Sequence, residues 1–297
     1  MPNVRAVPTL RRRRLGGTLR QYRKDVGKSL DVAARAMDWP ESKLSRIETA
    51  NARMLPKDIA PLLEQYGVTD PEVVTALESL AKDAGKQGWW QGFGDVVGAN
   101  YKDYLSLESD ADKIYVYAPN LLPGLLQTGP YAREIIAATA ITRTPQEVIA
   151  LAEIRKTRQS ILTNPTRSGG PLTYWAVIHE AVLHQTFASN SNLMVQQMQH
   201  LLDMADLPNI TIQIMPLRAT PHPGMLGPFE VVRFPHPWPT VVNLENIRGG
   251  YFVEGTDDVK VFETAFDRVV AAALPPDVSR EAIKGTMRKI MEERKDK

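Results

Sequence analysis

The chain has 297 residues, of which 43% are hydrophobic, and it contains no cysteine. This length and composition predict a globular protein with room for two domains. The lack of cysteine excludes disulfides and thiolate metal sites, and no apolar run is long enough to span a membrane. The basic N-terminus lacks the apolar stretch of a secretory signal, so we expect a cytoplasmic protein.

Charge is distributed unevenly along the chain. The net charge is only +2, but the first 57 residues hold fourteen Lys/Arg and five Asp/Glu, a net of +9. The other 240 residues therefore carry a net charge of −7. A basic end on a more neutral body is typical of nucleic-acid binding, and a solvated basic tail is the alternative.

The first third of the chain predicts an all-α head. Residues 1–10 lack apolar periodicity and predict a disordered arm. Residues 11–86 show the spacing of five amphipathic helices. The first of these helices starts with the basic block Arg11–Arg14 and ends at Gly27, since glycine commonly follows a helix end.

The second and third helices are short and joined by a tight turn. Ser29 is placed to cap the second helix, and Asp38-Trp39-Pro40 separates the two. The third helix carries Leu44 and Ile47 as its apolar face, while its remaining side chains are polar. A short helix with a small apolar face and a polar outer face is what a reader of the DNA major groove requires.

The rest of the chain predicts a connector followed by an α+β domain. Residues 87–110 begin with glycines and aromatics without a clear period, which indicates a connector. Residues 111–297 alternate short strands with helices and predict a small, mostly antiparallel sheet. We expect Asp257 and Ser279 to cap the last two helices.

The sequence offers no familiar catalytic or metal-binding motif. It lacks G-x-S-x-G, a P-loop and H-E-x-x-H, and none of its five histidines has zinc-ligand spacing to a second His or Glu. We therefore expect no catalytic residue, no metal and no cofactor. His222, between two prolines, is the one histidine that could serve a site, but we favour the alternative that it is a loop residue bonding a backbone carbonyl.

A set of residues near the N-terminus carries a family resemblance: Leu15-Gly16, Leu19-Arg20, Arg23, Gly27, Ala33-Ala34 and Leu44-Ser45-Arg46-Ile47-Glu48. With them, this segment resembles the Cro/C1-type (XRE) helix-turn-helix family of bacterial and phage repressors. The resemblance implies that Arg23 pairs with Glu48 and thereby fixes the third, recognition helix against the first.

The same resemblance implies a DNA-binding face. Arg46 suits guanine O6/N7 and Glu41 can accept from cytosine N4, while polar groups around helix ends hold phosphates. The implied DNA-binding residues are Ser29, Glu41, Ser42, Lys43, Ser45, Arg46, Asn51 and Arg53.

Two positions depart from the family pattern. Leu30 stands where the family often has a phosphate-clamping glutamine, and Ala50 stands where it usually has glycine. We expect Asn51 to take the left-handed backbone conformation in place of that glycine.

A second set of residues carries another resemblance: Leu122-Pro123-Gly124-Leu125-Leu126-Gln127-Thr128, Tyr131-Ala132, Arg155, Arg158-Gln159, His179–Leu183, Pro208–Ile210, His222–Gly224, Gly227–Glu230 and Ala271–Leu274. With them, the chain from about residue 90 resembles the antitoxin-like, WhiJ-like developmental regulators of high-GC bacteria. These join a helix-turn-helix to a large domain of unassigned function. The resemblance implies a small partner protein, encoded by a neighbouring gene, that binds the larger domain.

The Leu-Pro-Gly-Leu-Leu-Gln-Thr segment leaves two interpretations open. Gln127 and Thr128 could cap the helix that follows, or they could touch a ligand. The candidate partner or ligand site comprises Gln127, Thr128, Tyr131 and His222.

Two functions from different classes remain. The first is a sequence-specific transcriptional regulator, a nucleoid-associated repressor that binds palindromic double-stranded DNA as a homodimer under control of its C-terminal domain. The second is a hydrolase-like enzyme domain targeted by a DNA-binding head. A deep polar cleft holding a nucleophile would favour the enzyme, whereas a closed apolar core with an exposed groove would favour the regulator.

Overall fold

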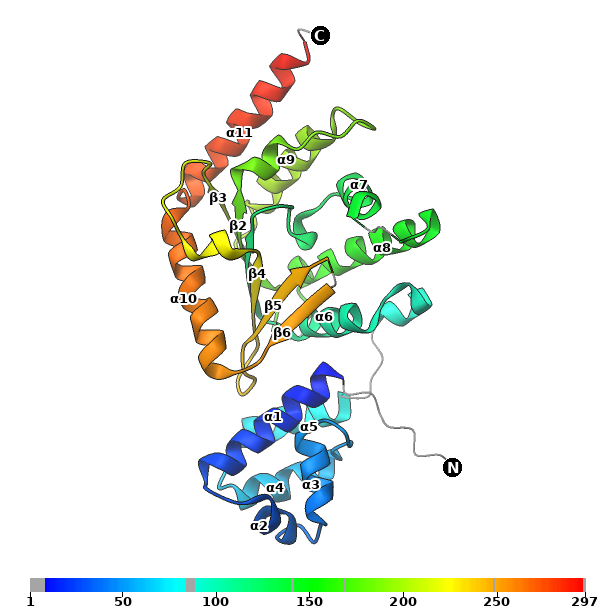
Figure 1. The fold of residues 1–297 in the computed structure, drawn as a ribbon, viewed down its shortest axis with the longest axis vertical. Coiled ribbons are helices and arrows are strands. Elements are labelled where there is room, and N and C mark those ends of the chain that lie inside the picture. The colour runs from blue at the N-terminus through cyan, green and yellow to red at the C-terminus, as the bar shows by residue number, and fades with distance from the viewer. Residues whose placement is uncertain (1–8, 84–88, 140–141, 168, 248, 296–297) are drawn as a thin grey trace. The chain divides into compact units, whose positions relative to one another are not determined.

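The computed structural model describes residues 9–83, 89–139, 142–167, 169–247 and 249–295 (Figure 1). The chain divides into two compact units. Unit 1 comprises Met1–Gly92, Lys102–Asp110 and Phe234–Pro239, and unit 2 comprises Phe93–Tyr101, Ala111–Arg233 and Thr240–Lys297. Most of the predicted N-terminal arm, residues 1–8, lies outside the described residues.

Unit 1 contains the predicted all-α head, which is confirmed. Its core is apolar, since Leu19, Leu44, Ile59, Leu62 and Leu77 are fully buried. Its elements are α1 Leu10–Asp25, α2 Leu30–Arg35, α3 Glu41–Glu48, the short 3₁₀ turn η1 Pro56–Asp58, α4 Ile59–Gln65 and α5 Pro71–Asp83.

The basic block at the start of α1 is largely engaged inside unit 1. The Arg11 guanidinium donates to both carboxylate oxygens of Asp110, at 2.9 and 2.7 Å. Arg14 is only 3% exposed, and its guanidinium carbon lies 3.6 Å from the centre of the Phe234 ring, a cation–π contact. The same carbon lies 5.3 Å from the centre of the Trp238 ring. Part of the positive charge counted at the N-terminus therefore holds unit 1 together.

The middle of α1 makes a close contact with α3 that only glycine allows. An added Cβ at Gly16 would lie 2.5 Å from the Ile47 carbonyl oxygen and 2.8 Å from that of Glu48. At the next position, Gly17, an added Cβ would meet no atom within 4 Å. The two adjacent glycines thus have different roles, and only Gly16 sets the distance between α1 and α3.

Gly16→Ala should lower the free energy of unfolding by about 1–3 kcal/mol, because the new methyl group overlaps the α3 backbone. Gly17→Ala should raise it by about 0.5–1 kcal/mol, because alanine is the better residue in a helix interior. Denaturant unfolding followed by circular dichroism measures both. Shifts of the same sign for the two variants would contradict the close approach.

Unit 2 is built on a sheet of six strands in the order β3-β2-β1-β4-β5-β6. The β1–β2 and β2–β3 pairs are parallel, and the other three pairs are antiparallel. The mostly antiparallel α+β prediction is confirmed, with a parallel half that requires helical crossovers. The strands are β1 Lys113–Ala118, β2 Thr173–His179, β3 Ile210–Met215, β4 Phe229–Arg233, β5 Val241–Asn246 and β6 Gly249–Val253.

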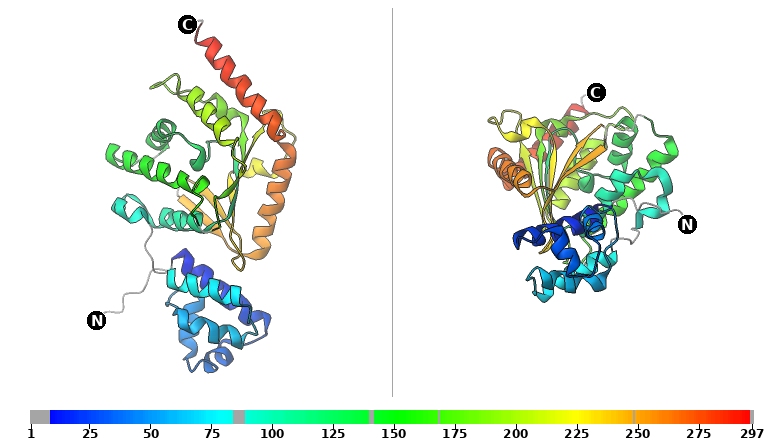
Figure 2. Two further views of the ribbon diagram at one scale, coloured as in Figure 1. Left: turned by 180° about the vertical axis from the view of Figure 1, so that it is seen from behind. Right: turned by 60° about the horizontal axis from the view of Figure 1, so that its bottom comes forward.

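Helices cover both faces of this sheet (Figures 1 and 2). The crossover helices α7 Gly129–Thr139, α8 Pro145–Arg158 and α9 Leu193–Met204 lie on one face, and α10 Thr256–Ala272 lies on the other. An aromatic cluster joins α10 to the sheet, with Tyr115 and Phe266 stacked at 5.3 Å between ring centres. The remaining described elements are η2 Trp89–Val96, α6 Ala99–Asp110, η3 Gly124–Leu126, η4 Gln159–Leu162, η5 Glu180–His184, η6 Pro223–Leu226 and α11 Pro276–Glu293.

The predicted connector over residues 87–110 contains more structure than its sequence indicated. It holds the 3₁₀ segment η2 and the twelve-residue helix α6. The buried residues of α6 are Leu105, Ser106, Leu107 and Glu108, a run that includes two polar side chains. This run hides the helical period, because the pattern of apolar residues alone does not mark the buried side.

Both predicted caps in the last helices are wrong. Gly255 precedes α10 without a side-chain cap, and Asp257 lies in the first turn of that helix. Pro276 opens α11 three residues before Ser279, as proline suits a first turn. The buried Ser279 hydroxyl instead accepts from the Ile214 N–H at 2.9 Å and donates to the Leu274 carbonyl at 3.0 Å. It ties α11 to the edge strand β3. Among the described residues, no helix is long and apolar enough to cross a membrane.

Candidate nucleic-acid interface

The segment from α2 to α3 has the geometry of a helix-turn-helix. The Ser29 hydroxyl accepts from the Val32 N–H at 3.2 Å and caps α2. The turn that follows includes Asp38 at a φ of 52°, a left-handed conformation that aspartate tolerates better than most residues. Pro40 then precedes α3 in an extended conformation. Two helices of six and eight residues are thereby joined by five residues.

A buried ion pair holds α3 against α1. The Arg23 Nε and Nη2 atoms donate to the two carboxylate oxygens of Glu48, at 2.7 and 2.8 Å. Its third nitrogen, Nη1, donates to the Lys28 carbonyl at 2.7 Å. The hydrogen bond to Glu48 raises the pKa of Arg23 despite the opposing effect of burial. A bidentate pair restricts rotation as well as distance, so it orients the whole of α3.

Glu48→Ala should lower the free energy of unfolding by about 3–5 kcal/mol, because the buried Arg23 guanidinium would lose its counter-charge. The matched control is Glu41→Ala, which removes an exposed carboxylate from the first turn of the same helix and should cost at most about 1 kcal/mol. Chemical denaturation of the two variants gives the comparison. Equal midpoints would show that the pair does not hold the helix.

The outer face of α3 presents the residues expected to contact bases. Glu41, Ser42 and Arg46 are exposed, whereas Lys43 and Ser45 are half-buried. The Arg46 Nε donates to the Ser42 carbonyl at 3.1 Å, so its guanidinium lies along its own helix. Ser42, Ser45 and Arg46 lie on the side of α3 away from the buried Leu44 and Ile47, and Glu41 and Lys43 flank that side.

Trp39 is a residue of this face that the sequence did not single out. The Lys43 ammonium lies 3.6 Å from the centre of the Trp39 ring, a cation–π contact. The contact joins the turn to the first turn of α3 and holds the lysine charge at one place. Trp39 and Lys43 are four residues apart, a spacing at which side chains on a helix contact each other. The contact was not predicted, because Pro40 places Trp39 outside the helix.

The left-handed residue that ends α3 is one position earlier in the chain than predicted. Ala50, with a φ of 62°, takes the left-handed conformation that was predicted for Asn51. The Ala50 N–H donates to the Ile47 carbonyl, and the Asn51 N–H donates to that of Arg46 at 2.7 Å. These two bonds form a Schellman motif, in which the left-handed residue is the second one after the helix. Since α3 ends at Glu48, that residue is Ala50.

The candidate phosphate contacts lie at the ends of these helices. Ser29, Asn51 and Arg53 are all exposed. The Asn51 side-chain amide donates to the Thr49 carbonyl at 3.2 Å and to its hydroxyl at 3.1 Å. The structure therefore gathers the eight candidate DNA-binding residues on and beside α2 and α3, within unit 1.

In unit 2, the Leu-Pro-Gly-Leu-Leu-Gln-Thr segment forms η3 and is held by side-chain amides. Gln127 is buried, and its amide nitrogen donates to the Leu122 carbonyl at 2.7 Å while its oxygen accepts from Arg155 at 2.8 Å. The fully buried Gln197 of α9 accepts from the Thr128 N–H and donates to the Leu126 carbonyl, both at 2.7 Å. These contacts fix η3 to α8 and α9. Gln197 was absent from the candidate residues because it lies about 70 residues further along the chain.

The other candidates for a partner or ligand site lie in two places. The Thr128 hydroxyl accepts from the Tyr131 N–H at 3.4 Å and caps α7, and Tyr131 is fully buried with its hydroxyl bonded to Gln185 at 2.8 Å. His222 precedes η6, and its ring packs edge-to-face against the Tyr117 ring with 5.5 Å between the ring centres. Burial, and then the nearby His179, lowers the pKa of His222. His222 thus stands apart from the Gln127 network.

Comparisons with known proteins bear on both units. Residues 101–285, more than half of the chain, match the family described as "Domain of unknown function (DUF5753)". The chain belongs to the DUF5753 family. Residues 14–77 match a family described as "Helix-turn-helix domain". No curated protein and no solved structure matches the chain.

The N-terminal match supports an XRE-like, DNA-binding helix-turn-helix domain in residues 14–77. The match begins inside α1 and runs through α2, α3 and α4 into α5, and therefore includes both the Arg23–Glu48 pair and the exposed face of α3. The likeness of the DUF5753 domain to the WhiJ-like regulators stays a prediction.

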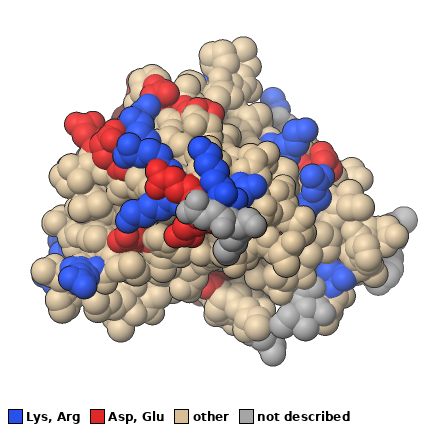
Figure 3. All heavy atoms as spheres, turned by 90° about the horizontal axis from the view of Figure 1, so that it is seen from above, with Lys and Arg blue, Asp and Glu red and all other residues tan. Residues whose placement is uncertain are grey.

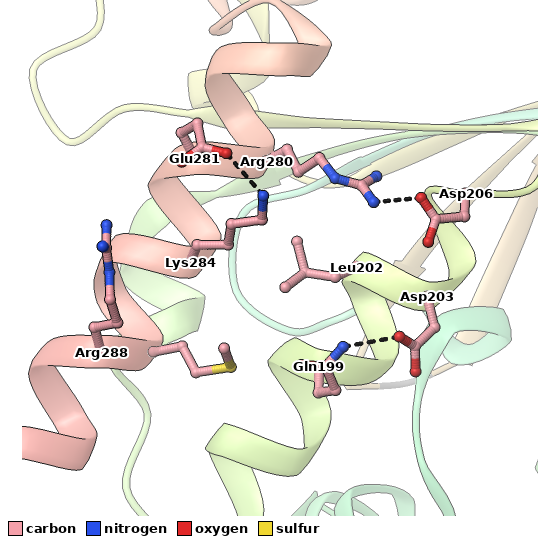
Figure 4. Close-up of a pocket in the computed structure, with 9 residues that line it drawn as sticks. Gln199, Leu202, Asp203, Asp206, Arg280, Glu281, Lys284 and Arg288 are labelled. Carbon is pink, nitrogen blue, oxygen red and sulfur yellow. Dashed lines mark hydrogen bonds and ion pairs between the residues drawn. The ribbon is translucent and has the colours of Figure 1, made fainter.

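The DUF5753 domain has an open groove of about 350 Å³ between α9 and α11 (Figure 4). Its rims carry Asp203 on α9, Asp206 in the turn after α9, and Arg280, Lys284 and Arg288 on α11. Several of these charges pair with each other or with neighbours, Arg280 with Asp206 and Lys284 with Glu281.

On the face seen in Figure 3, Lys and Arg lie among Asp and Glu without gathering into one field. A mixed surface of this kind does not build the single-sign potential that steers nucleic acid. Among the described residues, no group of three or more His, Asp or Glu is placed to hold a metal.

Proposed function

We propose that this protein is a sequence-specific transcriptional repressor that binds double-stranded DNA through α3. The observation that supports it is the exposed, polar outer face of α3, oriented by the buried Arg23–Glu48 pair. A recognition helix must present the same side chains to the groove at every encounter, so a fixed rotation favours specific over non-specific contacts.

In this proposal Arg46 makes the principal base contact. Its guanidinium can donate two hydrogen bonds to guanine O6 and N7 in the major groove. The contact to the Ser42 carbonyl uses only Nε and leaves the two terminal nitrogens for a base. Ser42, one turn earlier on the same face, and Glu41, at the N-terminal end of α3, would read neighbouring base pairs.

The remaining candidates would hold the sugar-phosphate backbone. Lys43, kept in place by Trp39, supplies a fixed positive charge beside the recognition face. Ser45, Ser29, Asn51 and Arg53 supply short polar groups and a second cation near helix ends. Contacts of this class set the register of the protein on the duplex without reading sequence.

The size of α3 favours a two-fold complex. Eight residues form a helix about 12 Å long, which covers only a few base pairs. Helix-turn-helix proteins gain affinity and specificity by dimerising on palindromic sites whose halves lie about one helical turn apart. A homodimer on such an operator is therefore part of the proposal.

Control of repression would come through the DUF5753 domain, in a regulatory rather than a catalytic role. Suppose that a small partner protein or a ligand binds this domain more tightly in one of two conformations, and that the two conformations differ in DNA affinity. Its binding would then change the DNA affinity by at most the ratio of its own affinities for the two conformations. The family resemblance points to a small protein from a neighbouring gene. Genome-wide DNA binding with and without that protein co-expressed would test this form of control.

Arg46→Ala should weaken binding to the operator by about 1–3 kcal/mol and relax preference at one base position, because a bidentate base contact is lost. Lys43→Ala should weaken binding to all sequences alike and reduce the salt slope by about one, because one phosphate contact is lost. Selection from a randomised duplex pool, followed by titrations at several salt concentrations, distinguishes the two effects.

Arg133→Ala, an exposed arginine of α7 in unit 2, is the matched control and should leave both properties unchanged. If Arg46→Ala and Lys43→Ala both bound as the parent does, α3 would not be the recognition helix. A loss caused by Arg133→Ala alone would place the DNA contact on the other unit.

A further inference from the structure

The outer face of α10 is a surface that the proposed function does not use. Asp257, Val261, Thr264 and Arg268 follow each other at spacings of four, three and four residues, so they share one side of the helix. All four are exposed, and Val261 is 65% exposed. They line an open groove of about 410 Å³, whose other residues are Pro223, Lys260 and Ala265.

A second apolar element borders this groove. The turn η6 packs beside α10, and it leaves Met225 63% and Leu226 96% exposed. Figures 1 and 2 show both elements at the outer surface of unit 2. Single exposed apolar residues are common, but three such side chains around an apolar groove are typical of a surface that another protein covers. We define this surface as the α10 face: Pro223, Met225, Leu226, Asp257, Lys260, Val261, Thr264, Ala265 and Arg268.

We propose that the α10 face is a homodimer interface, in which α10 packs antiparallel against α10 of a second copy across a two-fold axis. In this arrangement Asp257 of one copy lies opposite the partner's Arg268, and Val261 lies opposite the partner's Thr264. The two-fold axis repeats both contacts, so the interface is isologous. Antiparallel helices with small residues at the contact pack closely, and Thr264 and Ala265 are small.

Charge supports the second copy as the occupant. Asp257 and Arg268 lie eleven residues apart, which is about three turns, at opposite ends of the same face. A parallel pairing would set each charge against its own kind, whereas the antiparallel pairing neutralises both. Neither side chain has an ion-pair partner in the part of the chain that the structure describes. The face is thus complementary to itself in one orientation only.

The apolar residues beside α10 supply buried interface area that the charged pairs alone do not provide. A stable interface buries about 1,200–2,000 Å² in total, more than one pair of short helices provides. Met225 and Leu226 extend the face beyond α10, and burying them would remove the most exposed apolar side chains of this region from water. The proposal deepens the proposed function, since it supplies the two-fold dimer that a palindromic operator requires.

Charge reversal tests the register without DNA. Sedimentation velocity of the full chain should show a dimer for the parent, and Asp257→Arg or Arg268→Asp alone should weaken dimerisation at least about tenfold, because each places like charges together twice. The double variant Asp257→Arg/Arg268→Asp exchanges the two signs and should restore the dimer to within about threefold of the parent. Glu153→Arg, an exposed charge reversal on α8, is the control and should leave the dimer intact.

Recovery in the double variant supports the antiparallel pairing. A monomeric parent would overturn the proposal and leave the α10 face to a different protein. A dimer that ignores the single reversals, or one that the double reversal fails to restore, would place the interface elsewhere. Because no DNA is present, these outcomes are independent of the tests of Arg46 and Lys43, which would stand or fall separately.

Discussion

The Arg23–Glu48 ion pair is the contact on which the DNA-binding head depends. Helix α3 has eight residues, and only Leu44 and Ile47 are apolar and buried. Two apolar side chains attach a helix but leave its rotation loosely defined. The bidentate pair at its C-terminal end removes that freedom, since both carboxylate oxygens must meet one guanidinium. Replacing such a pair by apolar residues often costs little stability, so its value here is orientation.

Two further features act on the same helix. Gly16 lets the α1 backbone approach the carbonyl oxygens of Ile47 and Glu48, and this fixes the distance that the ion pair spans. Tyr66, whose pKa is raised by burial and then by the Glu48 charge, stays a neutral phenol beside it. Rotation, distance and burial together determine which side chains α3 presents outward.

Buried amides play the corresponding part in unit 2. Gln127, directly after η3, donates to the Leu122 carbonyl before it, and Gln197 of α9 donates to the Leu126 carbonyl within it. Local unfolding of the loop would therefore leave buried polar groups unpaired. The segment that most strongly carried the second family resemblance is therefore a brace between β1, α8 and α9. Features that identify a family need not mark where its members bind.

The features that could be predicted from the sequence are those that depend on residues close together in the chain. The five helices of the head follow from local periodicity and caps. The left-handed residue after α3 was misplaced by one position, because that position depends on the residue at which the helix ends. Ser279 was taken for a cap because its partner on β3, Ile214, lies 65 residues away in sequence. Helix α6 was missed because Ser106 and Glu108 are buried among its leucines.

The charges of α10 have a simpler explanation than dimerisation, and it accounts for only part of the face. An aspartate in the first turn complements the helix dipole, so Asp257 would stabilise an isolated α10, whereas Arg268 lies before the last turn, where the dipole acts. The dipole gives no reason for Val261 to face water, nor for Leu226 to stand 96% exposed beside it. Exposed apolar area costs free energy unless something covers it. The two observations together, charges at opposite ends and apolar residues between and beside them, favour a surface shaped to meet its own copy.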